Sequence, residues 1–281
     1  MANGPPIGAP TMTAGGYESS VTGASTPYQG FAARLRARET LIGYWIALDS
    51  PVSTERIGRL GFDYVAFDAQ HGLIGYDGLL RGLMAVDAGA RAVGVVRVGA
   101  NDQYLIGRAL DAGAAAVIVP LIDNAAQAAQ AIRYTRYAPT GVRSYGPMRS
   151  ALRIGPNPAE AHEQVAVLAM IETVDGLANV EEICAVPGLT GVYIGPYDLR
   201  ISLGGSTPTD PALTDVFEAA LQRVREAANA AGVAAGIHTH NGATAAQRLG
   251  EGFTFVSIAS DLTHLEQAAQ GHLAAARGPR L

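Results

Sequence analysis

Four apolar stretches of this sequence each end in ionisable side chains that could share one reaction site. VAFDAQH ends on Asp68 and His71, VGVVR ends on Arg97, MIETVDG carries Glu172, and GVYIGPYDL carries Asp198. In a parallel β/α fold the carboxyl ends of the strands converge on one mouth, so side chains far apart in the chain can act together there. The pattern predicts an enzyme.

Glu172 and Asp198 are the candidates for a metal site. Carboxylates without cysteines or paired histidines are hard oxygen ligands, which suit Mg²⁺ or Mn²⁺. Because they follow two consecutive apolar strands, we expect both to hold one divalent cation, with water and substrate completing an octahedron. The alternative is that each acid only caps the helix that follows it.

His71 is a candidate general base, because an imidazole with an ordinary pKa of about 6.5 can accept a proton at neutral pH. The alternative is a loop histidine bonded to the local backbone. Asp111, ahead of the fourth strand, could orient the imidazole from another part of the fold. The pattern around Asp111 is equally consistent with an acid at the end of a helix.

Arg97 closes a strand that is otherwise entirely apolar. A guanidinium in that position is costly unless it is paired or faces the mouth of the fold. Directed at a developing enolate oxygen, it would stabilise a transition state. A structural salt bridge within the fold is the alternative.

Three further groups have weaker patterns. Arg143 lies in the arginine-rich segment RYAPTGVRSYGPMRSALR and could receive an anionic substrate tail, whereas the other arginines there suit a solvated helix or a subunit contact. His238 and His240 form an H-x-H pair, which is only a weak zinc signal without further ligands. Trp45 is expected to pack near the mouth.

The elements that must position these residues are eight short strands separated by alanine-rich helical stretches such as 124–137 and 211–232. The runs are continuously apolar, which is typical of strands buried on both faces. They predict a single-domain (β/α)8 TIM barrel. A doubly wound open sheet is the alternative, but no GxGxxG supports it. The expected strands are 43–48, 63–67, 92–97, 115–120, 165–172, 191–195, 233–238 and 253–260.

Composition limits the class of protein. The chain has 281 residues, 48% of them hydrophobic and 16% charged, as expected for one large α/β domain. The net charge of −5 argues against nucleic-acid binding. No stretch is long and apolar enough to cross a membrane, and the N-terminus does not resemble a secretion signal. We expect residues 1–30, rich in Gly, Pro, Ser and Thr, to form a flexible tail before a barrel at 31–281.

Two residue types add information through their scarcity. Cys184 is the one cysteine, which excludes an internal disulfide framework and favours the cytoplasm. Lysine is absent from the sequence, since all 20 residues counted as Lys+Arg are arginine. The chain therefore cannot form the lysine Schiff base of a class I aldolase.

Several motifs together resemble the HpcH/HpaI aldolase family, the metal-dependent class II pyruvate aldolases. They are GFDYVAFDAQHG, VVRVG, LDAGAAAVIVP, RYAPTGVRSYG, IETVDG and IGPYDL, in the family's order between about Gly43 and the 250s. The resemblance implies a (β/α)8 barrel assembled as a hexamer, with sites near subunit interfaces.

The resemblance also implies roles for individual residues. Glu172 and Asp198 would be the metal ligands, His71 the base, Arg97 the enolate stabiliser and Asp111 the partner that raises the basicity of the histidine. Asp68 belongs to the same D-x-E-H pattern and would share the catalytic site.

Three substrate-contact positions depart from the family pattern. Gln70 stands where many members have glutamate in D-x-E-H. Met170 stands where some members place a glutamine that touches substrate, and Tyr197 where many have alanine. These departures leave the metal site intact and leave the aldehyde half of the substrate open.

The sequence therefore predicts a lyase that uses Mg²⁺, Mn²⁺ or Co²⁺ to cleave a 4-hydroxy-2-oxo acid into pyruvate and an aldehyde. Its partners would be a small oxo acid, an aldehyde and further copies of the chain. One rival is a macrophomate-synthase-like decarboxylation of oxaloacetate, in which the enolate attacks a second substrate. The other rival is a non-catalytic barrel that binds a metal or a metabolite.

Overall fold

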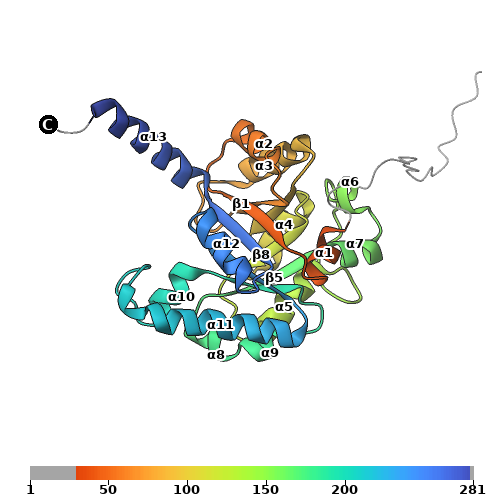
Figure 1. Ribbon diagram of the computed structural model, residues 1–281. Coiled ribbons are helices and arrows are strands. Elements are labelled where there is room, and N and C mark those ends of the chain that lie inside the picture. Colours follow the sequence, from red (N-terminus) through yellow and green to blue (C-terminus); the bar gives the residue numbers. More distant parts are fainter. Residues whose placement is uncertain (1–29, 279–281) are drawn as a thin grey trace, which may run out of the picture.

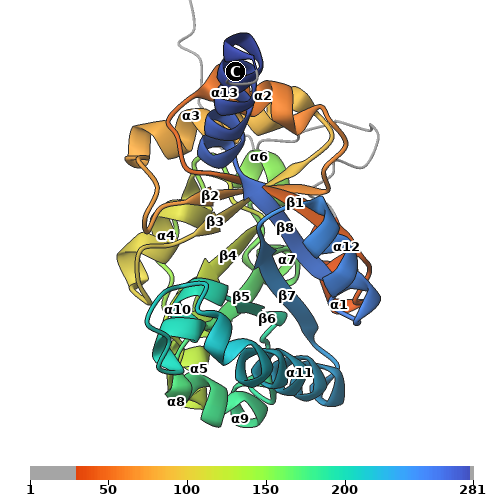
Figure 2. The same cartoon turned by 60° about the vertical axis from the view of Figure 1, so that its left-hand side comes forward.

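The chain forms a closed barrel of parallel strands (Figures 1 and 2), and the computed structural model describes residues 30–278. Neighbouring strands follow one another in chain order, and Leu41 pairs with Phe255 to close the ring. The predicted (β/α)8 barrel is confirmed, and the open-sheet alternative is wrong. The strands are β1 Leu41–Ile46, β2 Tyr64–Asp68, β3 Val93–Arg97, β4 Ala116–Val119, β5 Ala166–Ile171, β6 Gly191–Ile194, β7 Ala234–Thr239 and β8 Phe255–Ser260.

Helices surround the barrel, and several begin where the side-chain oxygen of the preceding residue accepts a free backbone amide of the first turn, as Asp102 does from the Leu105 amide. The predicted helix 211–232 is divided into a short 3₁₀ turn and a long α-helix. The elements are α1 Phe31–Arg36, α2 Pro51–Gly58, α3 Tyr76–Gly89, α4 Gln103–Asp111, α5 Ala125–Thr135, α6 Ala151–Ile154, α7 Pro158–Gln164, α8 Val174–Ala178, α9 Val180–Cys184, α10 Pro196–Ser202, η1 Pro211–Leu213, α11 Thr214–Ala231, α12 Gly242–Gly250 and α13 Asp261–Arg277.

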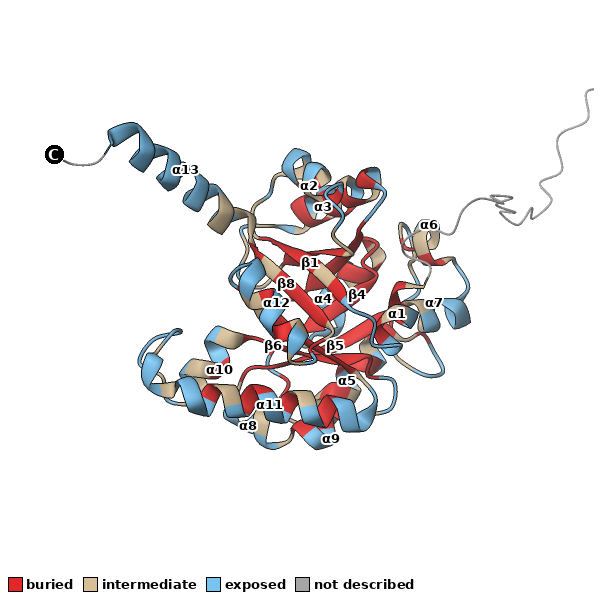
Figure 3. Ribbon diagram, in the orientation of Figure 1, coloured by how far each residue is buried: buried red, intermediate tan, exposed pale blue. Residues whose placement is uncertain are grey.

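The strands are buried on both faces (Figure 3), which explains why their sequences are continuously apolar. Outward side chains pack under the helices, and inward ones fill the barrel. Glycine is required at position 43 inside the barrel, because a Cβ there would lie 2.1 Å from the side-chain ring of Tyr64.

One end of the barrel is plugged. Phe31 of α1 packs against Tyr64 and Phe255, the first residues of β2 and β8, with ring centroids 6.3 and 6.4 Å apart. All three side chains are fully buried. Since α1 closes the amino ends of the strands, a ligand must enter at their carboxyl ends.

The last helix does not join the outer ring. α13 projects from the end of β8 (Figures 1 and 3) and contains no buried residue. Its apolar side chains Leu262, Leu265 and Leu273 are 38%, 61% and 51% exposed. α13 therefore does not complete the outer ring of helices within one chain.

Two further predictions concern the limits of the chain. The predicted tail 1–30 lies outside the described residues except for Gly30, which precedes α1. Within residues 30–278, none of the helices is both long enough and apolar enough to cross a membrane.

Candidate active site

A cavity of about 440 Å³ opens at the carboxyl ends of the strands. It receives side chains from seven of the strand ends and the loops that follow them. Its lining includes Trp45, Asp68, His71, Arg97, Met170, Gly195, Tyr197, Asp198, His238, His240 and Ser260. Most of the residues that the sequence selected are therefore brought together here, although they come from distant parts of the chain.

Asp68 and Arg97 form an ion pair at the base of the cavity. They are the last residues of β2 and β3 and are direct partners in the ladder between these strands. Arg97 Nε donates to Asp68 Oδ1 at 2.9 Å, and Nη2 donates to Oδ2 at 2.5 Å. Arg97 has 8% of its surface exposed and Asp68 has 5%. Both arrangements that the sequence allowed for Arg97 are therefore present: it forms a salt bridge with Asp68, and it lines the cavity at the mouth of the barrel.

The electrostatics of Asp68 follow from this pairing. Burial alone raises the pKa of its carboxyl group, but the hydrogen bonds and charge of Arg97 lower it more. The His71 amide and Trp45 contribute in the same direction, so the pKa of Asp68 lies below its ordinary value. Arg97 Nη1 has no hydrogen-bond partner within residues 30–278 and remains available to a ligand.

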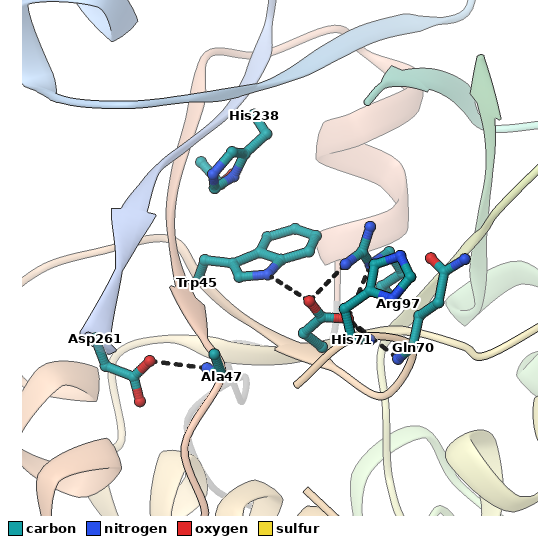
Figure 4. A network of polar contacts seen from close by, with 9 residues as sticks. Trp45, Ala47, Gln70, His71, Arg97, His238 and Asp261 are labelled. Atoms are coloured by element: carbon teal, nitrogen blue, oxygen red, sulfur yellow. Dashed lines mark hydrogen bonds and ion pairs between the residues drawn. The ribbon is translucent and has the colours of Figure 1, made fainter. Parts of the chain in front are cut away.

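The same carboxylate shapes the loop that carries His71. Asp68 Oδ1 accepts from the backbone amides of Gln70 at 3.1 Å and His71 at 3.0 Å. Figure 4 shows these contacts together with Arg97 and Trp45. The imidazole of His71 is exposed and borders the cavity, while Gln70 Oε1 is buried with no protein hydrogen-bond partner in the described part of the chain.

Trp45 forms the wall behind the ion pair, as expected from its place on the first strand. Its Nε1 donates to Asp68 Oδ2 at 3.3 Å, and the Arg97 guanidinium carbon lies 5.2 Å from the centroid of the indole ring. A guanidinium beside an indole face is attracted by the ring quadrupole. Trp45 therefore fixes the orientation of Arg97 from a second side.

Glu172 follows β5 and is almost fully buried, with 2% of its surface exposed. Its Oε1 accepts from the Leu121 amide at 2.8 Å, and Leu121 adopts a left-handed backbone with φ of 54°. Such a backbone costs about 1–2 kcal/mol for a residue with a side chain, and here it directs an amide at the carboxylate. Thr173 is the residue that caps α8, so the helix-cap alternative for Glu172 is wrong.

Glu172 and Asp198 influence each other across Gly195. A Cβ at Gly195 would lie 2.4 Å from Glu172 Oε2, so only glycine leaves room for this carboxylate. Asp198 lies in the first turn of α10 and borders the same cavity. Burial raises the pKa of Glu172 to about 7, and the negative charge of Asp198 contributes to the increase.

This pair of acids fits a divalent cation. Glu172 Oε2 accepts no hydrogen bond from residues 30–278, although the carboxylate is buried. A bound cation would compensate the cost of burying this charge. Within the same residues no three His, Cys, Asp or Glu side chains cluster as a ready metal cage. The remaining positions would therefore belong to water and substrate, as is usual for Mg²⁺.

Two predicted site residues are not brought to the mouth within one chain. Asp111 is the last residue of α4, which runs back from β3 toward the opposite end of the barrel. There its Oδ1 accepts from Arg143 Nη2 at 2.7 Å, and the Arg143 guanidinium lies 4.6 Å from the centroid of the Tyr137 ring. Neither residue lines the cavity. The sequence could not exclude them, because residues before a strand and residues after it look alike without the fold.

His238 and His240 do not form the H-x-H metal pair. His238 Nδ1 is hydrogen-bonded to Ser257 Oγ at 2.8 Å, whereas His240 Nδ1 is bonded to the Tyr197 hydroxyl at 3.0 Å. The hydrogen-bonded set of His238, Ser257 and Tyr193 was not predicted from the sequence. The feature that could have indicated it is Ser257, a polar residue in the middle of an apolar strand.

Comparisons with known proteins identify the family of this chain. The profile of the HpcH/HpaI aldolase/citrate lyase family matches residues 41–268. The hydroxypyruvate/pyruvate aldolase of Rhizorhabdus wittichii is 41% identical over 85% of this chain and 95% of its own length. The 5-keto-4-deoxy-D-glucarate aldolase of Klebsiella pneumoniae is 36% identical over 85% of this chain and 93% of its own.

Solved structures give the same result. A HpcH/HpaI aldolase/citrate lyase family protein from Burkholderia cenocepacia superposes with a TM-score of 0.80 and is 32% identical, over 89% of this chain and 99% of its own. Macrophomate synthase shares the fold, with a TM-score of 0.79 at 24% identity, over 90% of this chain and 89% of its own. The family is generally one of divalent-metal-dependent aldolases. By sequence and by fold, this chain belongs to the HpcH/HpaI aldolase/citrate lyase family.

Proposed function

We propose that the protein is a divalent-metal-dependent aldolase that cleaves, or forms, 4-hydroxy-2-oxo acids by way of pyruvate enolate. The chain is a carbon–carbon lyase, and its substrates are a small oxo acid and an aldehyde. The observation that carries the proposal is that Asp198, Arg97 and His71 line one cavity with Gly195, and that the Glu172 carboxylate lies against Gly195, close enough for the charges of Asp198 and Arg97 to act on it. The absence of lysine requires a route without a Schiff base.

In this proposal Glu172 and Asp198 hold one Mg²⁺, Mn²⁺ or Co²⁺ ion. The chemistry that such an ion supplies is Lewis-acid polarisation of the keto oxygen. Arg97 uses its free Nη1 to donate to the oxygen that becomes negative, while Asp68 holds the guanidinium in place. Burial of this arginine keeps the donor fixed before the reaction starts.

His71 accepts the proton of the C4 hydroxyl, through a water molecule. As the O–H bond breaks, the C4 carbonyl forms, the C3–C4 bond breaks and its electron pair becomes the pyruvate enolate. Protonation of C3 then yields pyruvate. Met170, Tyr197 and Gln70 are proposed to contact the substrate, since the first two line the cavity and Gln70 adjoins His71. Asp111 and Arg143 could contribute only from a neighbouring copy of the chain.

The test is exchange of the pyruvate methyl protons, which does not require knowledge of the aldehyde. In heavy water, deuterium should enter the methyl group only when the protein and Mg²⁺, Mn²⁺ or Co²⁺ are both present, because enolisation needs the cation and Arg97 together. Proton NMR measures the rate, with free metal and chelated protein as controls. Exchange no faster with loaded protein than with free metal would reject the aldolase and favour a binding protein.

The macrophomate-synthase-like alternative uses the same enolate and is separated by a second measurement. Because it obtains the enolate by decarboxylation, it predicts turnover of oxaloacetate in the absence of any aldehyde. Pyruvate-dependent addition to aldehydes, with slower oxaloacetate turnover, is the outcome expected here.

We further propose that the active assembly is a homohexamer, with α13 docked on a neighbouring copy. The exposed leucines of α13 are apolar surface that one chain leaves uncovered. Light scattering at micromolar concentration should give six times the 29.0 kDa of one chain. Leu265→Glu places a charge in this surface and should lower the mass, whereas a monomeric wild type would contradict the assembly.

We also propose that the protein is cytoplasmic. Its one cysteine, Cys184, is buried and unpaired, which suits a reducing compartment.

A further inference from the structure

A short chain of hydrogen bonds leads from the cavity into the barrel core. His238 lies near the end of β7 and pairs in register with Ser257 of β8. His238 Nδ1 and Ser257 Oγ are 2.8 Å apart, and Ser257 Oγ is 2.6 Å from the Tyr193 hydroxyl. Tyr193 and Ser257 are completely buried, whereas His238 also borders the cavity. None of these three residues has a role in the enolate chemistry proposed above.

One arrangement of protons satisfies each donor of this chain. Burial raises the pKa of the Tyr193 phenol, so it keeps its proton. A buried donor without an acceptor is costly, and Ser257 Oγ can accept from the Tyr193 hydroxyl. Ser257 can in turn donate to His238 Nδ1. In this arrangement a neutral imidazole carries its proton on Nε2.

His238 is held neutral and in one orientation. Its pKa is lowered to about 4, chiefly by burial and secondly by the charges of His240 and Arg97. Its ring meets the edge of Trp45 at a centroid distance of 5.1 Å and an angle of 65° (Figure 4). Nε2 has no hydrogen-bond partner within residues 30–278. In the arrangement with the proton on Nε2, the cavity has one uncharged N–H donor on its β7 side.

The side chains that line the cavity with His238 are mainly neutral hydrogen-bonding groups. They are those of Tyr197, His240, Ser260, Thr263 and Gln267. An adjoining cavity shares Tyr197, His238 and His240 and is also lined by Arg200. This part of the cavity therefore offers hydroxyl and amide groups to the second substrate.

We infer that His238 determines the aldehyde, by donating from Nε2 to a hydroxyl oxygen on the carbon next to the carbonyl, and that the preferred aldehydes are hydroxyaldehydes. Ser257 and Tyr193 are positioning residues that act through His238. This inference rests on the proposed aldolase function and specifies its second substrate.

Three aldehydes that differ in one substituent provide the test. Glycolaldehyde carries a hydroxymethyl group, acetaldehyde a methyl group and glyoxylate a carboxylate. Each is added to pyruvate with the metal-loaded enzyme, and kcat/KM is measured. Because the three differ in intrinsic reactivity, the decisive quantity is how their ratios change between wild type and variant.

His238→Leu removes the donor while keeping an apolar side chain. The ratio of kcat/KM for glycolaldehyde over acetaldehyde should fall about tenfold, the effect of one hydrogen bond. Addition should fall much more than pyruvate methyl exchange, which involves no aldehyde. Ser257→Ala should lower the same ratio, and Ser257→Thr, which keeps the hydroxyl, should restore it. A purely structural effect would lower kcat/KM for all three aldehydes and the rate of methyl exchange by similar factors.

The outcomes test the role of His238 and the aldolase function separately. An unchanged ratio in both His238→Leu and Ser257→Ala, with exchange intact, would overturn the role of His238 and leave the aldolase standing. A wild type that prefers acetaldehyde to glycolaldehyde would overturn the hydroxyaldehyde class. Absence of exchange in the wild type would remove the aldolase function and this inference with it.

Discussion

Replacing Glu172 with glutamine is expected to lower metal-dependent exchange of the pyruvate methyl protons by about 10³-fold or more, because a metal contribution of several kcal/mol converts to such a factor. Glutamine keeps the shape and can still accept from the Leu121 amide, but it carries no charge to hold a cation. The variant therefore removes the electrostatic part of the site and leaves its packing.

Folding provides an independent measurement of this variant. The buried carboxylate of Glu172 is a cost to the metal-free protein, since burial raises its pKa by more than the Leu121 amide and the charge of Arg97 lower it. Metal-free Glu172→Gln should therefore unfold at the same temperature as metal-free wild type, or higher. Added Mn²⁺ should raise the unfolding temperature of the wild type only.

Asp175→Asn is the matched control. Asp175 is an exposed acid three residues further along the chain, in the first turn of α8. It should keep both the exchange rate and the stabilisation by Mn²⁺. Full exchange by Glu172→Gln, or equal stabilisation of both proteins by Mn²⁺, would contradict the assignment of Glu172 as a ligand.

Arg97→Ala is expected to slow enolisation by about 10²–10³-fold, the usual effect of removing a preorganised donor to an oxyanion. The same change leaves Asp68 buried without its partner, so the free energy of unfolding should fall by roughly 3–5 kcal/mol. Exchange at saturating pyruvate and metal measures the first effect, and urea denaturation measures the second.

Arg97→Lys separates charge from geometry. A lysine supplies a positive charge to Asp68 but cannot make the two parallel hydrogen bonds of a guanidinium. We expect it to recover much of the stability and little of the exchange rate, because no donor remains where Nη1 stood. Wild-type exchange by either variant, under conditions in which it is folded, would show that Arg97 is structural only.

These two predictions concern neighbouring charges at one end of the barrel. Glu172 and Asp198 supply negative charge, and Arg97 supplies a fixed donor whose charge is largely balanced by Asp68. In the proposed function, the acids would hold the cation and Arg97 would donate to the enolate oxygen, so no lysine is needed.

Much of the fold was determined by local sequence pattern. Continuous apolar runs between alanine-rich stretches gave eight strands, and each predicted strand overlaps an observed one. Such runs are informative because strands covered by helices outside and by side chains inside need apolar residues on both faces. The polar residues that end the runs, among them Asp68, Arg97 and Glu172, were found for a related reason. A charged side chain directly after a buried strand is costly unless it is paired or faces a polar cavity.

The tertiary structure alone decided which of these groups meet. Asp68 pairs with Arg97 because β2 and β3 are in register, and Glu172 receives the Leu121 amide across two different strand ends. Asp111 and Arg143 pair at the other end of the barrel, although the sequence had placed them in the site.

The contacts among His238, Ser257 and Tyr193 were likewise decided by the tertiary structure. Each residue belongs to a different strand, and none of the three segments of sequence shows which residues of the other strands it meets. Periodicity along a chain reports whether a residue is buried, because burial of a strand is a property of neighbouring positions. Contacts between strands depend on register and closure of the whole barrel, which are set by all eight strands together.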